Sequence, residues 1–358
     1  MAPVPALPYS PRVTHPSMDS GFVRACRGLP VTHTPIWLMR QAGRYMKEYR
    51  ELRARVSFLE LCRTPELVAE TTVFAQETIG ADAAIVFSDL LVVLEAMGQD
   101  LHYPKGGPKL GPPVRTGADV DALRIPEPEA LSYVWDGVAA TRDALKPDVP
   151  LIGFCGAPFT LAAYAIEAGG SRNFRYAKTL MYSDTGAWNE LCRKIVETLV
   201  PYLVGQARAG AQVVQVFDSW VGAVGPDDYA RYVAPHSAEL IRRFKEQCPD
   251  TPLIHFGTGT APLLEQVQAA GGDVVGVDFH TDFAQARQRL GDDQPVMGNL
   301  DPILLYAPVD VLLKRAQAVL DANAGRDGHV FNLGHGITPP TPISAVETLV
   351  ETVQGFSK

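Results

Sequence analysis

The sequence predicts an α/β protein of the (β/α)8 class, a single-domain TIM barrel, and three observations lead to that prediction. Eight short apolar segments recur along the 358 residues. Helical patterns separate these segments, and strand–helix alternation of this kind is typical of a parallel sheet. Polar residues and glycines follow the segments, at the end of the barrel where active sites of this fold lie. A doubly wound sheet is the alternative, but it gives no reason for eight repeats.

The eight predicted strands are continuous apolar runs. They do not alternate apolar with polar residues, and this pattern is typical of parallel strands that are covered on both faces. They are residues 36–39, 83–87, 151–154, 213–217, 253–256, 274–277, 295–297 and 330–333.

Two of the intervening helices carry clear boundary signals. Thr64, Pro65 and Glu66 form a cap, an N1 proline and an early acid, and the pattern stops at Gly80. Residues 184–210 carry apolar side chains at helical spacing around an internal proline.

The chain is predicted to hold one catalytic domain. Residues 1–17 are rich in proline and are predicted to be a flexible tail, and residues 18–358 form the barrel. Residues 98–128 interrupt the strand–helix rhythm with many prolines and glycines. We interpret them as an inserted loop with a short hairpin at 101–103.

Composition excludes several classes of partner. The formal net charge is −8, which disfavours sequence-independent binding to nucleic acid or to an anionic membrane. No apolar run approaches the length of a transmembrane helix. The five cysteines are widely spaced, with no CxxC pair, and the N-terminus does not resemble a signal peptide. The expected location is therefore the cytoplasm. The scattered histidines predict no metal site, and no nucleotide-binding motif follows the first strand.

A basic segment follows the first predicted strand. Residues 40–55 hold six cationic and two acidic side chains in a chain that is otherwise acidic. A solvated helix face is the ordinary interpretation of such a run. Arg40 argues against it, because it directly follows an apolar strand, and arginine binds carboxylate or phosphate with two parallel hydrogen bonds. The glycines at 257 and 259 could instead hold a phosphate, or could simply form a tight turn.

Three further polar residues follow predicted strands or lie near their ends. Asp89 follows the second strand, where a carboxylate is paired, caps a helix or is functional. Tyr164 lies in the helix after the third strand, where a tyrosine can also be core. His335 lies between Gly334 and Gly336, which leave room for a ligand.

Several of these segments resemble the uroporphyrinogen decarboxylase family. The motifs are PIWLMRQAGRY at 35–45, IVFSDL at 85–90, GFCGAPFTL at 153–161, FDSW at 217–220, GNLDP at 298–302 and NLGHG at 332–336. The resemblance covers about residues 18–355.

The resemblance implies a homodimer that needs no cofactor. It implies decarboxylation of the four acetate side chains of uroporphyrinogen III, a polyanionic tetrapyrrole, to give coproporphyrinogen III on the way to haem. Carried over by motif, the substrate-binding residues are Arg40, Ala42, Arg44, Arg53, Asp89, Tyr164, Ser219 and His335. Of these, Asp89, Arg40, Tyr164 and His335 are the expected catalytic residues. The choice of proton donor among Arg40, Tyr164 and His335 stays open at this point.

Two other functions are compatible with the same motifs. Related barrels act as zinc-dependent methyltransferases on corrinoid or thiol substrates, and Cys155 is the one cysteine that follows a predicted strand closely enough to be a ligand. A tetrapyrrole-binding protein without catalytic activity is the third hypothesis.

Overall fold

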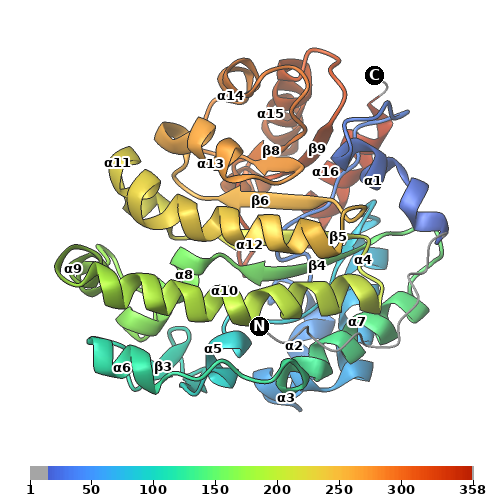
Figure 1. Cartoon of the computed structure of the whole chain (residues 1–358). Coiled ribbons are helices and arrows are strands. Elements are labelled where there is room, and N and C mark those ends of the chain that lie inside the picture. The colour runs from blue at the N-terminus through green and yellow to red at the C-terminus, as the bar shows by residue number, and fades with distance from the viewer. Residues whose placement is uncertain (1–14, 357–358) are drawn as a thin grey trace.

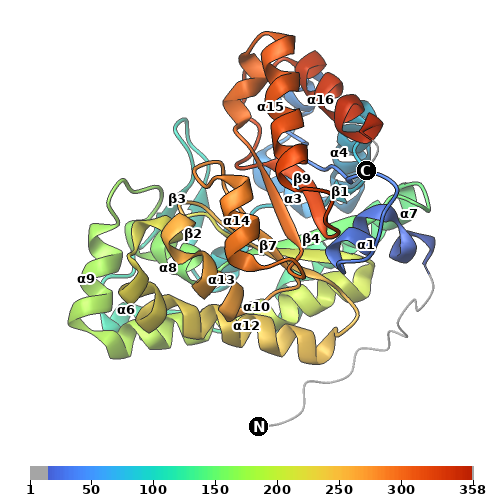
Figure 2. The same ribbon diagram turned by 90° about the horizontal axis from the view of Figure 1, so that it is seen from above.

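A curled parallel sheet forms the centre of the molecule (Figure 1, Figure 2). The computed structural model describes residues 15–356, and in it seven parallel strands are hydrogen-bonded in the order β1, β4, β5, β6, β7, β8, β9. Their bounds are β1 Ala84–Ile85, β4 Leu151–Gly156, β5 Val213–Asp218, β6 Leu253–Gly257, β7 Val274–Gly276, β8 Val296–Leu300 and β9 His329–Leu333.

Each strand of this sheet pairs with its neighbour along the chain. Ile152 lies opposite Val213, and Val214 lies opposite Leu253. Every residue of β4, β6, β8 and β9 is buried, as the continuous apolar runs predicted. Because all seven strands run in the same direction, the loops that leave them gather at one end of the sheet.

The prediction that residues 36–39 form the first strand of this sheet was wrong. Ile36 makes one isolated parallel bridge to Phe331 of β9, and on its other side its carbonyl accepts from the N–H of Asp82, 2.8 Å away. The segment therefore lies between the two edge strands without pairing along its length. Side chains replace the ladder, because Leu38 N–H donates to Gln41 Oε1 and Met39 N–H donates to Asn332 Oδ1. The eight-stranded prediction is confirmed in part, as a curled sheet of seven strands.

Helices surround the sheet. The longer ones are α4 Pro65–Ile79, α7 Ser132–Ala144, α8 Pro158–Glu167, α9 Arg175–Ser183, α10 Thr185–Ala209, α12 Ala234–Gln247, α14 Phe283–Leu290, α15 Val309–Ala322 and α16 Ile343–Gly355. The shorter ones are α1 Gly21–Cys26, α2 Lys47–Arg53, α3 Phe58–Arg63, α5 Val92–Ala96, α6 Gly117–Ala122, α11 Pro226–Asp228 and α13 Leu264–Ala270, with single turns at Pro16–Asp19, Pro128–Leu131, Val221–Ala223, Tyr229–Val233, Ala261–Leu263 and Pro302–Tyr306.

The helix boundary signals of the sequence are confirmed. Helix α4 starts at Pro65 and ends before Gly80, which adopts a left-handed conformation with φ of 67° and caps the helix. Helix α10 spans 25 residues and contains Pro201. Figure 1 shows α10 and α12 lying side by side over the sheet.

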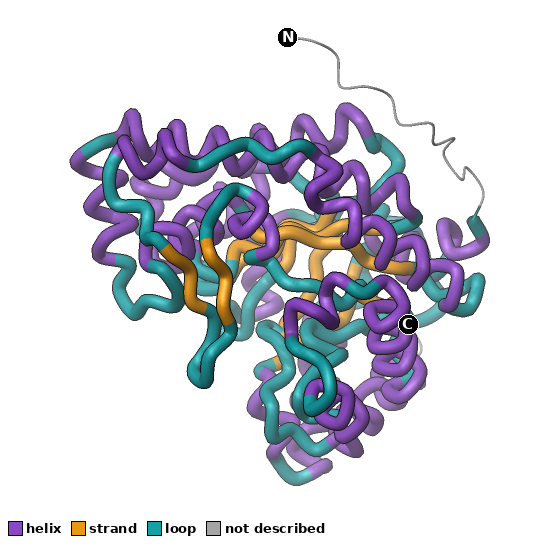
Figure 3. Tube along the Cα trace, turned by 90° about the horizontal axis from the view of Figure 1, so that it is seen from below, coloured by secondary structure: helices purple, strands orange, loops and turns teal. Residues whose placement is uncertain are grey.

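The segment 98–128 contains a hairpin that is separate from the main sheet (Figure 3). Strands β2 Asp100–His102 and β3 Lys109–Gly111 pair in antiparallel fashion. The predicted hairpin at 101–103 overlaps the first of these strands, but the second strand was not predicted. The hairpin is tied to the end of α8, because Leu110 N–H donates to the carbonyl of Ala168. Of the predicted tail, residues 1–14 lie outside the described residues, and Ser17 is buried in the turn Pro16–Asp19.

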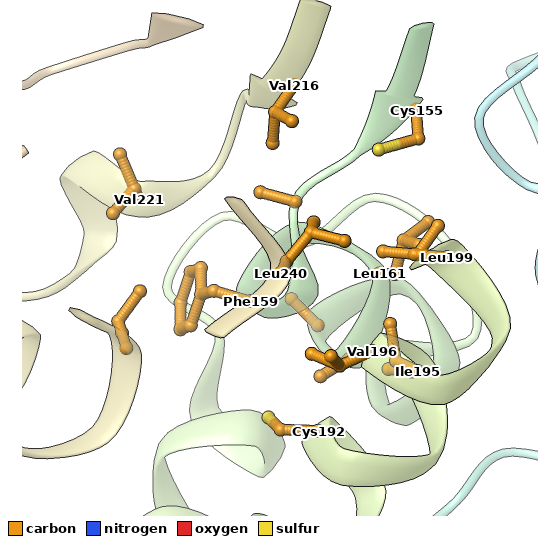
Figure 4. Close-up of a cluster of buried hydrophobic side chains, with 14 of the residues drawn as sticks. Cys155, Phe159, Leu161, Cys192, Ile195, Val196, Leu199, Val216, Val221 and Leu240 are labelled. Atoms are coloured by element: carbon orange, nitrogen blue, oxygen red, sulfur yellow. The ribbon is translucent and has the colours of Figure 1, made fainter. Parts of the chain in front are cut away.

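Cys155 lies in the core between the sheet and the helices. Figure 4 shows its side chain among apolar side chains of α8 and α10, together with Val216 of β5. The residue is 1% exposed, and burial raises the pKa of its thiol. The side chain therefore belongs to the packing of the outer layer.

Candidate active site

A cavity of about 290 Å³ opens at the carboxyl ends of the strands. Its walls are mainly apolar, with a small number of polar groups, as is usual for small-molecule sites. Six of the eight residues predicted to bind substrate line it: Arg40, Ala42, Asp89, Tyr164, Ser219 and His335. They come from five different segments of the chain, which the parallel sheet brings together at one end.

Arg40 is held in an unusual backbone conformation. Its φ is 63°, a left-handed value that is unfavourable for a residue with a side chain and is often found at functional sites. The guanidinium arm passes directly over Gly336, where a Cβ would lie only 2.5 Å from Arg40 Cδ. Glycine at 336 therefore lets the arginine lie across the loop beside His335.

Asp89 presents a carboxylate to an apolar wall. Ile85, Val86 and Phe87 line the cavity beside it, and burial raises the pKa of the carboxyl group above its ordinary value. Tyr103, the N–H of Leu91 and the charge of Arg40 act in the opposite direction and lower that pKa. Leu91 N–H donates to Asp89 Oδ1 at 2.8 Å, which orients the group. No salt bridge within residues 15–356 involves this carboxylate.

His335 has a defined tautomer. The N–H of Gly336 donates to His335 Nδ1 at 2.8 Å, so in the neutral ring the proton is on Nε2. Burial, with Arg40 as a second cause, lowers the pKa of His335 below its usual value. At neutral pH the ring is therefore uncharged and offers Nε2–H as a hydrogen-bond donor.

The segments that carry Tyr164 and Ser219 are connected through a buried carboxyl group, that of Asp218. Thr160 lies one helical turn before Tyr164, and its hydroxyl donates to Asp218 Oδ1 at 2.7 Å. The same hydroxyl oxygen accepts the N–H of Trp220 at 3.2 Å, and the Trp220 ring lies 5.6 Å from the ring of Tyr164. Burial raises the pKa of Asp218 to about 7. This network fixes the end of β5 against the start of α8.

Arg44 and Arg53 do not line the cavity. Arg44 is exposed, and Arg53 donates to the carbonyl of Val56 and lies over the ring of Phe58, 5.6 Å from its centre. Phe58 in turn packs against Tyr103 of the cavity wall at 4.5 Å. Of the basic segment 40–55, only Arg40 contributes a cation to the cavity lining.

Two residues of this region, Tyr103 and Asp218, were not predicted from the sequence. Tyr103 lies on the cavity wall at the end of the β2–β3 hairpin, and no periodic pattern in that irregular segment marks it. Asp218 lay in the FDSW motif, and a carboxylate directly after an apolar strand was the available signal.

A metal site is not formed by the described residues. Within residues 15–356, no group of three or more His, Cys, Asp and Glu side chains could hold a metal ion. Cys155, the candidate zinc ligand of the methyltransferase hypothesis, lies on β4 with its side chain packed between the sheet and the helices, and it does not line the cavity. In the same residues, no helix is both long and apolar enough to cross a membrane.

The fold and the cavity together define an α/β protein with a pocket at the carboxyl ends of parallel strands, whose lining presents one cation, Arg40, and one carboxylate, Asp89. Residues 18–356 match the family model described as uroporphyrinogen decarboxylase (URO-D), and the chain belongs to this family.

Two curated relatives and one solved structure illustrate the similarity. The uroporphyrinogen decarboxylase of Syntrophotalea carbinolica is 50% identical over 341 residues, covering 95% of this chain and 98% of the relative. That of Solibacter usitatus is 48% identical over 340 residues, with 95% and 98% covered. A methyltransferase from Methanosarcina mazei matches with a TM-score of 0.79 at 21% identity, covering 94% and 98% of the two chains. At that identity the structural match shows the fold alone.

Proposed function

We propose that the chain removes the carboxyl groups of the four acetate side chains of uroporphyrinogen III and releases coproporphyrinogen III. The family match and the curated relatives support this reaction in tetrapyrrole biosynthesis. The structural observation that carries the proposal is the Asp89 carboxylate, which has no ion-pair partner within residues 15–356 and faces a cavity that also holds Arg40 and His335.

The reaction has two chemical requirements. Loss of CO2 leaves an electron pair on the side-chain carbon, and that pair needs an acceptor. Protonation of the attached pyrrole at a ring carbon supplies one, because it creates a cationic iminium. The exocyclic carbon then takes up a proton and the ring returns one, so each acetate consumes one proton and becomes a methyl group. The protein must therefore stabilise a cation and hold a carboxylate beside it.

Asp89 is proposed to stabilise the cation. Its oxygens accept hydrogen bonds, so they can bind the pyrrole N–H groups at the centre of the macrocycle. The charge on those nitrogens rises as the iminium forms, so a fixed carboxylate stabilises the transition state more than the ground state. The apolar wall strengthens this effect, since electrostatic interactions are stronger away from water.

The other cavity residues are proposed to bind the reacting acetate and the ring. Arg40 binds the acetate carboxylate, and Nε2–H of His335 donates to a second carboxylate oxygen. Burial raises the pKa of Tyr164, so its hydroxyl stays protonated at neutral pH and can donate a proton or a hydrogen bond. Ala42 and Ser219 form the wall against which the macrocycle packs. Arg44 and Arg53 are proposed to contribute positive potential from outside the lining.

The test is anaerobic incubation of the purified protein with uroporphyrinogen III, followed by oxidation and separation of the products by carboxyl number. We expect products with seven, six, five and four carboxyl groups, with EDTA present and no cofactor added. Unchanged substrate, under conditions in which the Syntrophotalea carbinolica relative is active, would refute the proposal. Decarboxylation that is lost on chelation and restored by zinc would refute the cofactor-independent mechanism, and stoichiometric bound zinc in the purified protein would favour the methyltransferase hypothesis.

Three further expectations come from the sequence analysis, the first of them from the family resemblance. We propose that the protein is a homodimer, that it acts in the cytoplasm, and that residues 36–39 close the curled sheet into an eight-stranded barrel. The hydrogen bonds of this segment to Phe331 on one side and Asp82 on the other support the last point. Sedimentation equilibrium at micromolar concentration tests the first, and a mass near 39 kDa would contradict it.

A further inference from the structure

A buried carboxylate and an exposed imidazole form a pair in the loop that leaves β7. Asp278 is completely buried, whereas 63% of the His280 side chain is exposed. His280 Nδ1 lies 2.7 Å from Asp278 Oδ2. A carboxylate only accepts hydrogen bonds, so Nδ1 carries the proton of this contact and the opposite ring nitrogen, Nε2, points away from Asp278.

The loop that carries this pair is held on several sides. Asp278 Oδ2 also accepts the N–H of Gly259, at 2.8 Å, from the loop that leaves β6. Asn299 of β8 donates through its amide to the carbonyls of Asp278 and Thr281, at 2.9 and 2.6 Å. The His280 ring also stacks on Phe279, with 4.1 Å between ring centres. A fixed orientation gives an exposed side chain no packing advantage. A side chain that binds a ligand does benefit, because it is already held in the binding geometry.

This pair lies beside the cavity rather than within it. The backbone of Phe279 packs directly on Gly334, where an added Cβ would lie 2.1 Å from Phe279 N. His335 follows Gly334, and its electrostatic environment includes Asp278, His280 and Arg40. His280 is not part of the cavity lining. Its ring therefore lies outside the lining but close enough to His335 for the two imidazoles to interact electrostatically.

We propose that His280 binds a carboxylate of the porphyrinogen at the rim of the cavity, with Asp278 as the residue that positions its ring. In the imidazolium form, Nδ1–H donates to Asp278 and Nε2–H donates to the ligand. This inference rests on the proposed function, because that substrate carries eight carboxylates around its periphery. A cavity that binds one acetate next to Arg40 leaves other carboxylates near its edge.

The competing explanation is structural. Asp278 could serve only to hold the loop, by accepting hydrogen bonds from the N–H of Gly259 and the hydroxyl of Thr281. In that case His280 would only cover it. The two explanations differ in the role of Nε2. If the pair only closes the loop, removing Nε2 while retaining a donor to Asp278 changes nothing in substrate binding.

His280→Asn makes that change, because its side-chain amide can replace Nδ1–H towards Asp278 and has nothing in place of Nε2. His236→Asn is the matched control, since His236 lies on α12 and its ring contacts Asn189. Steady-state kinetics with uroporphyrinogen and with the five-carboxyl intermediate should be measured for both variants and the wild type. For a largely exposed charged contact we expect KM of His280→Asn to rise about three- to fivefold with kcat unchanged. The control should match the wild type.

The two substrates identify which carboxylate is bound. An equal rise in KM for both indicates a propionate, which the reaction retains, and a smaller rise for the five-carboxyl intermediate indicates an acetate. Either result supports the inference. A KM of His280→Asn within about 1.5-fold of the wild type for both substrates overturns it, as does a fall in kcat at constant KM. Thermal melts check folding, and if the asparagine protein does not fold, His280→Ala replaces it and is compared with His280→Gln, which keeps a donor near the position of Nε2 and should bind substrate more tightly than His280→Ala.

The failure of this inference is distinguishable from failure of the proposed function. If the wild type shows no decarboxylation, the proposed function is refuted. Binding of oxidised uroporphyrin, measured by fluorescence quenching, then compares the wild type with His280→Asn directly. An equal Kd for the two proteins in that assay overturns the inference, and a weaker Kd for the variant supports it.

Discussion

Arg287 lies beside the loops that enter β8 and β9, whereas Arg40 lies at the opposite end of the sheet. The Arg287 side chain is buried, and its terminal nitrogens donate to the carbonyls of Asp292, Gln294 and Asp327. Arg40 makes no hydrogen bond or ion pair with another side chain of residues 15–356 and lines the cavity from a strained backbone. The same residue type thus stabilises the loops at one end and remains available to a ligand at the other.

The carboxylates show the same difference. Asp273, ahead of β7, accepts from the N–H of Leu253 and pairs with Lys245 at 2.9 Å. Asp89, after β1, accepts one backbone N–H and has no ion-pair partner within residues 15–356. Arg287 and Asp273, at the end where the chain enters the sheet, are satisfied by the protein, whereas Arg40 and Asp89, at the end where it leaves, are only partly satisfied. Mutations at the two ends should therefore separate loss of activity from loss of stability.

The largest expected effect is at Asp89. Asp89→Asn keeps the size of the side chain but removes the charge, so kcat should fall by about 10²–10³. Asp89→Glu retains the charge and should retain measurable turnover. Burial raises the pKa of the carboxyl group, which means that the folded protein holds the charged form at a cost. Asp89→Asn should therefore melt at or above the wild-type temperature. Steady-state kinetics and thermal melts on the same preparations test both statements.

An active Asp89→Asn protein would remove the electrostatic role. An inactive protein that is also unfolded would instead assign Asp89 to the structural group and would abolish the difference between the two ends of the sheet.

The second largest effect is at Arg40. Arg40→Ala removes a charge-assisted contact to substrate, which typically reduces kcat/KM about ten- to a hundredfold. Arg44 is exposed and lies outside the cavity lining, so Arg44→Ala should have a smaller effect, about threefold or less. Equal losses in the two variants would show that the whole basic segment, rather than Arg40 alone, faces the substrate.

The positive φ of Arg40 gives this prediction a control. Glycine adopts a φ of 63° without strain, whereas alanine does not. Arg40→Gly should therefore be as inactive as Arg40→Ala but more stable, by about 1 kcal/mol. Equal melting temperatures for the two variants would contradict the strained conformation.

Much of this arrangement could be predicted from the sequence, because parallel strands buried on both faces leave continuous apolar runs. Seven of the eight runs are strands of the sheet. The exception, residues 36–39, is apolar because it is also buried, but it makes only one isolated backbone bridge, and the N–H groups of Leu38 and Met39 donate to the side chains of Gln41 and Asn332. An apolar stretch of sequence alone does not distinguish a strand with a full hydrogen-bond ladder from a buried segment held by side-chain contacts.

The candidate site was predictable where a polar residue directly follows a strand. Asp89 and His335 both do, and the structure brings them into one cavity. Tyr103 could not be found in that way, because a hairpin outside the sheet brings it to the cavity wall. Arg44 and Arg53 illustrate the opposite limit, since a charge run does not reveal which of its members faces the cavity.

Arg287→Met tests the other end of the sheet. The substitution keeps much of the aliphatic volume but leaves three loop carbonyls without their donor, so unfolding should become easier by about 1–3 kcal/mol. Because these loops enter the strands far from the cavity lining, kcat and KM should stay within about twofold of the wild type. Denaturant unfolding and steady-state kinetics measure the two quantities. A variant that loses activity without losing stability would contradict the proposed division between the ends.

The smallest expected effect concerns Asp218, which lies at the carboxyl end of β5 but behaves as a buried structural group. Burial raises its pKa from 3.8 to about 7. Between these two values the folded state binds a proton that the unfolded state has released, so this group makes the protein less stable as the pH rises from about 4 to 7, with no further change above 7.

Asp218→Asn cannot titrate and keeps an oxygen that accepts from Thr160. Its melting temperature should therefore rise relative to that of the wild type as the pH increases over that range. The limiting slope is about 1.4 kcal/mol per pH unit. Thermal melts of both proteins at pH 5, 6, 7 and 8 measure this difference, with Asp282→Asn, at the exposed cap of α14, as the control. A difference in melting temperature between Asp218→Asn and the wild type that does not change with pH would mean that Asp218 stays ionised throughout and shares the partly satisfied character of Asp89.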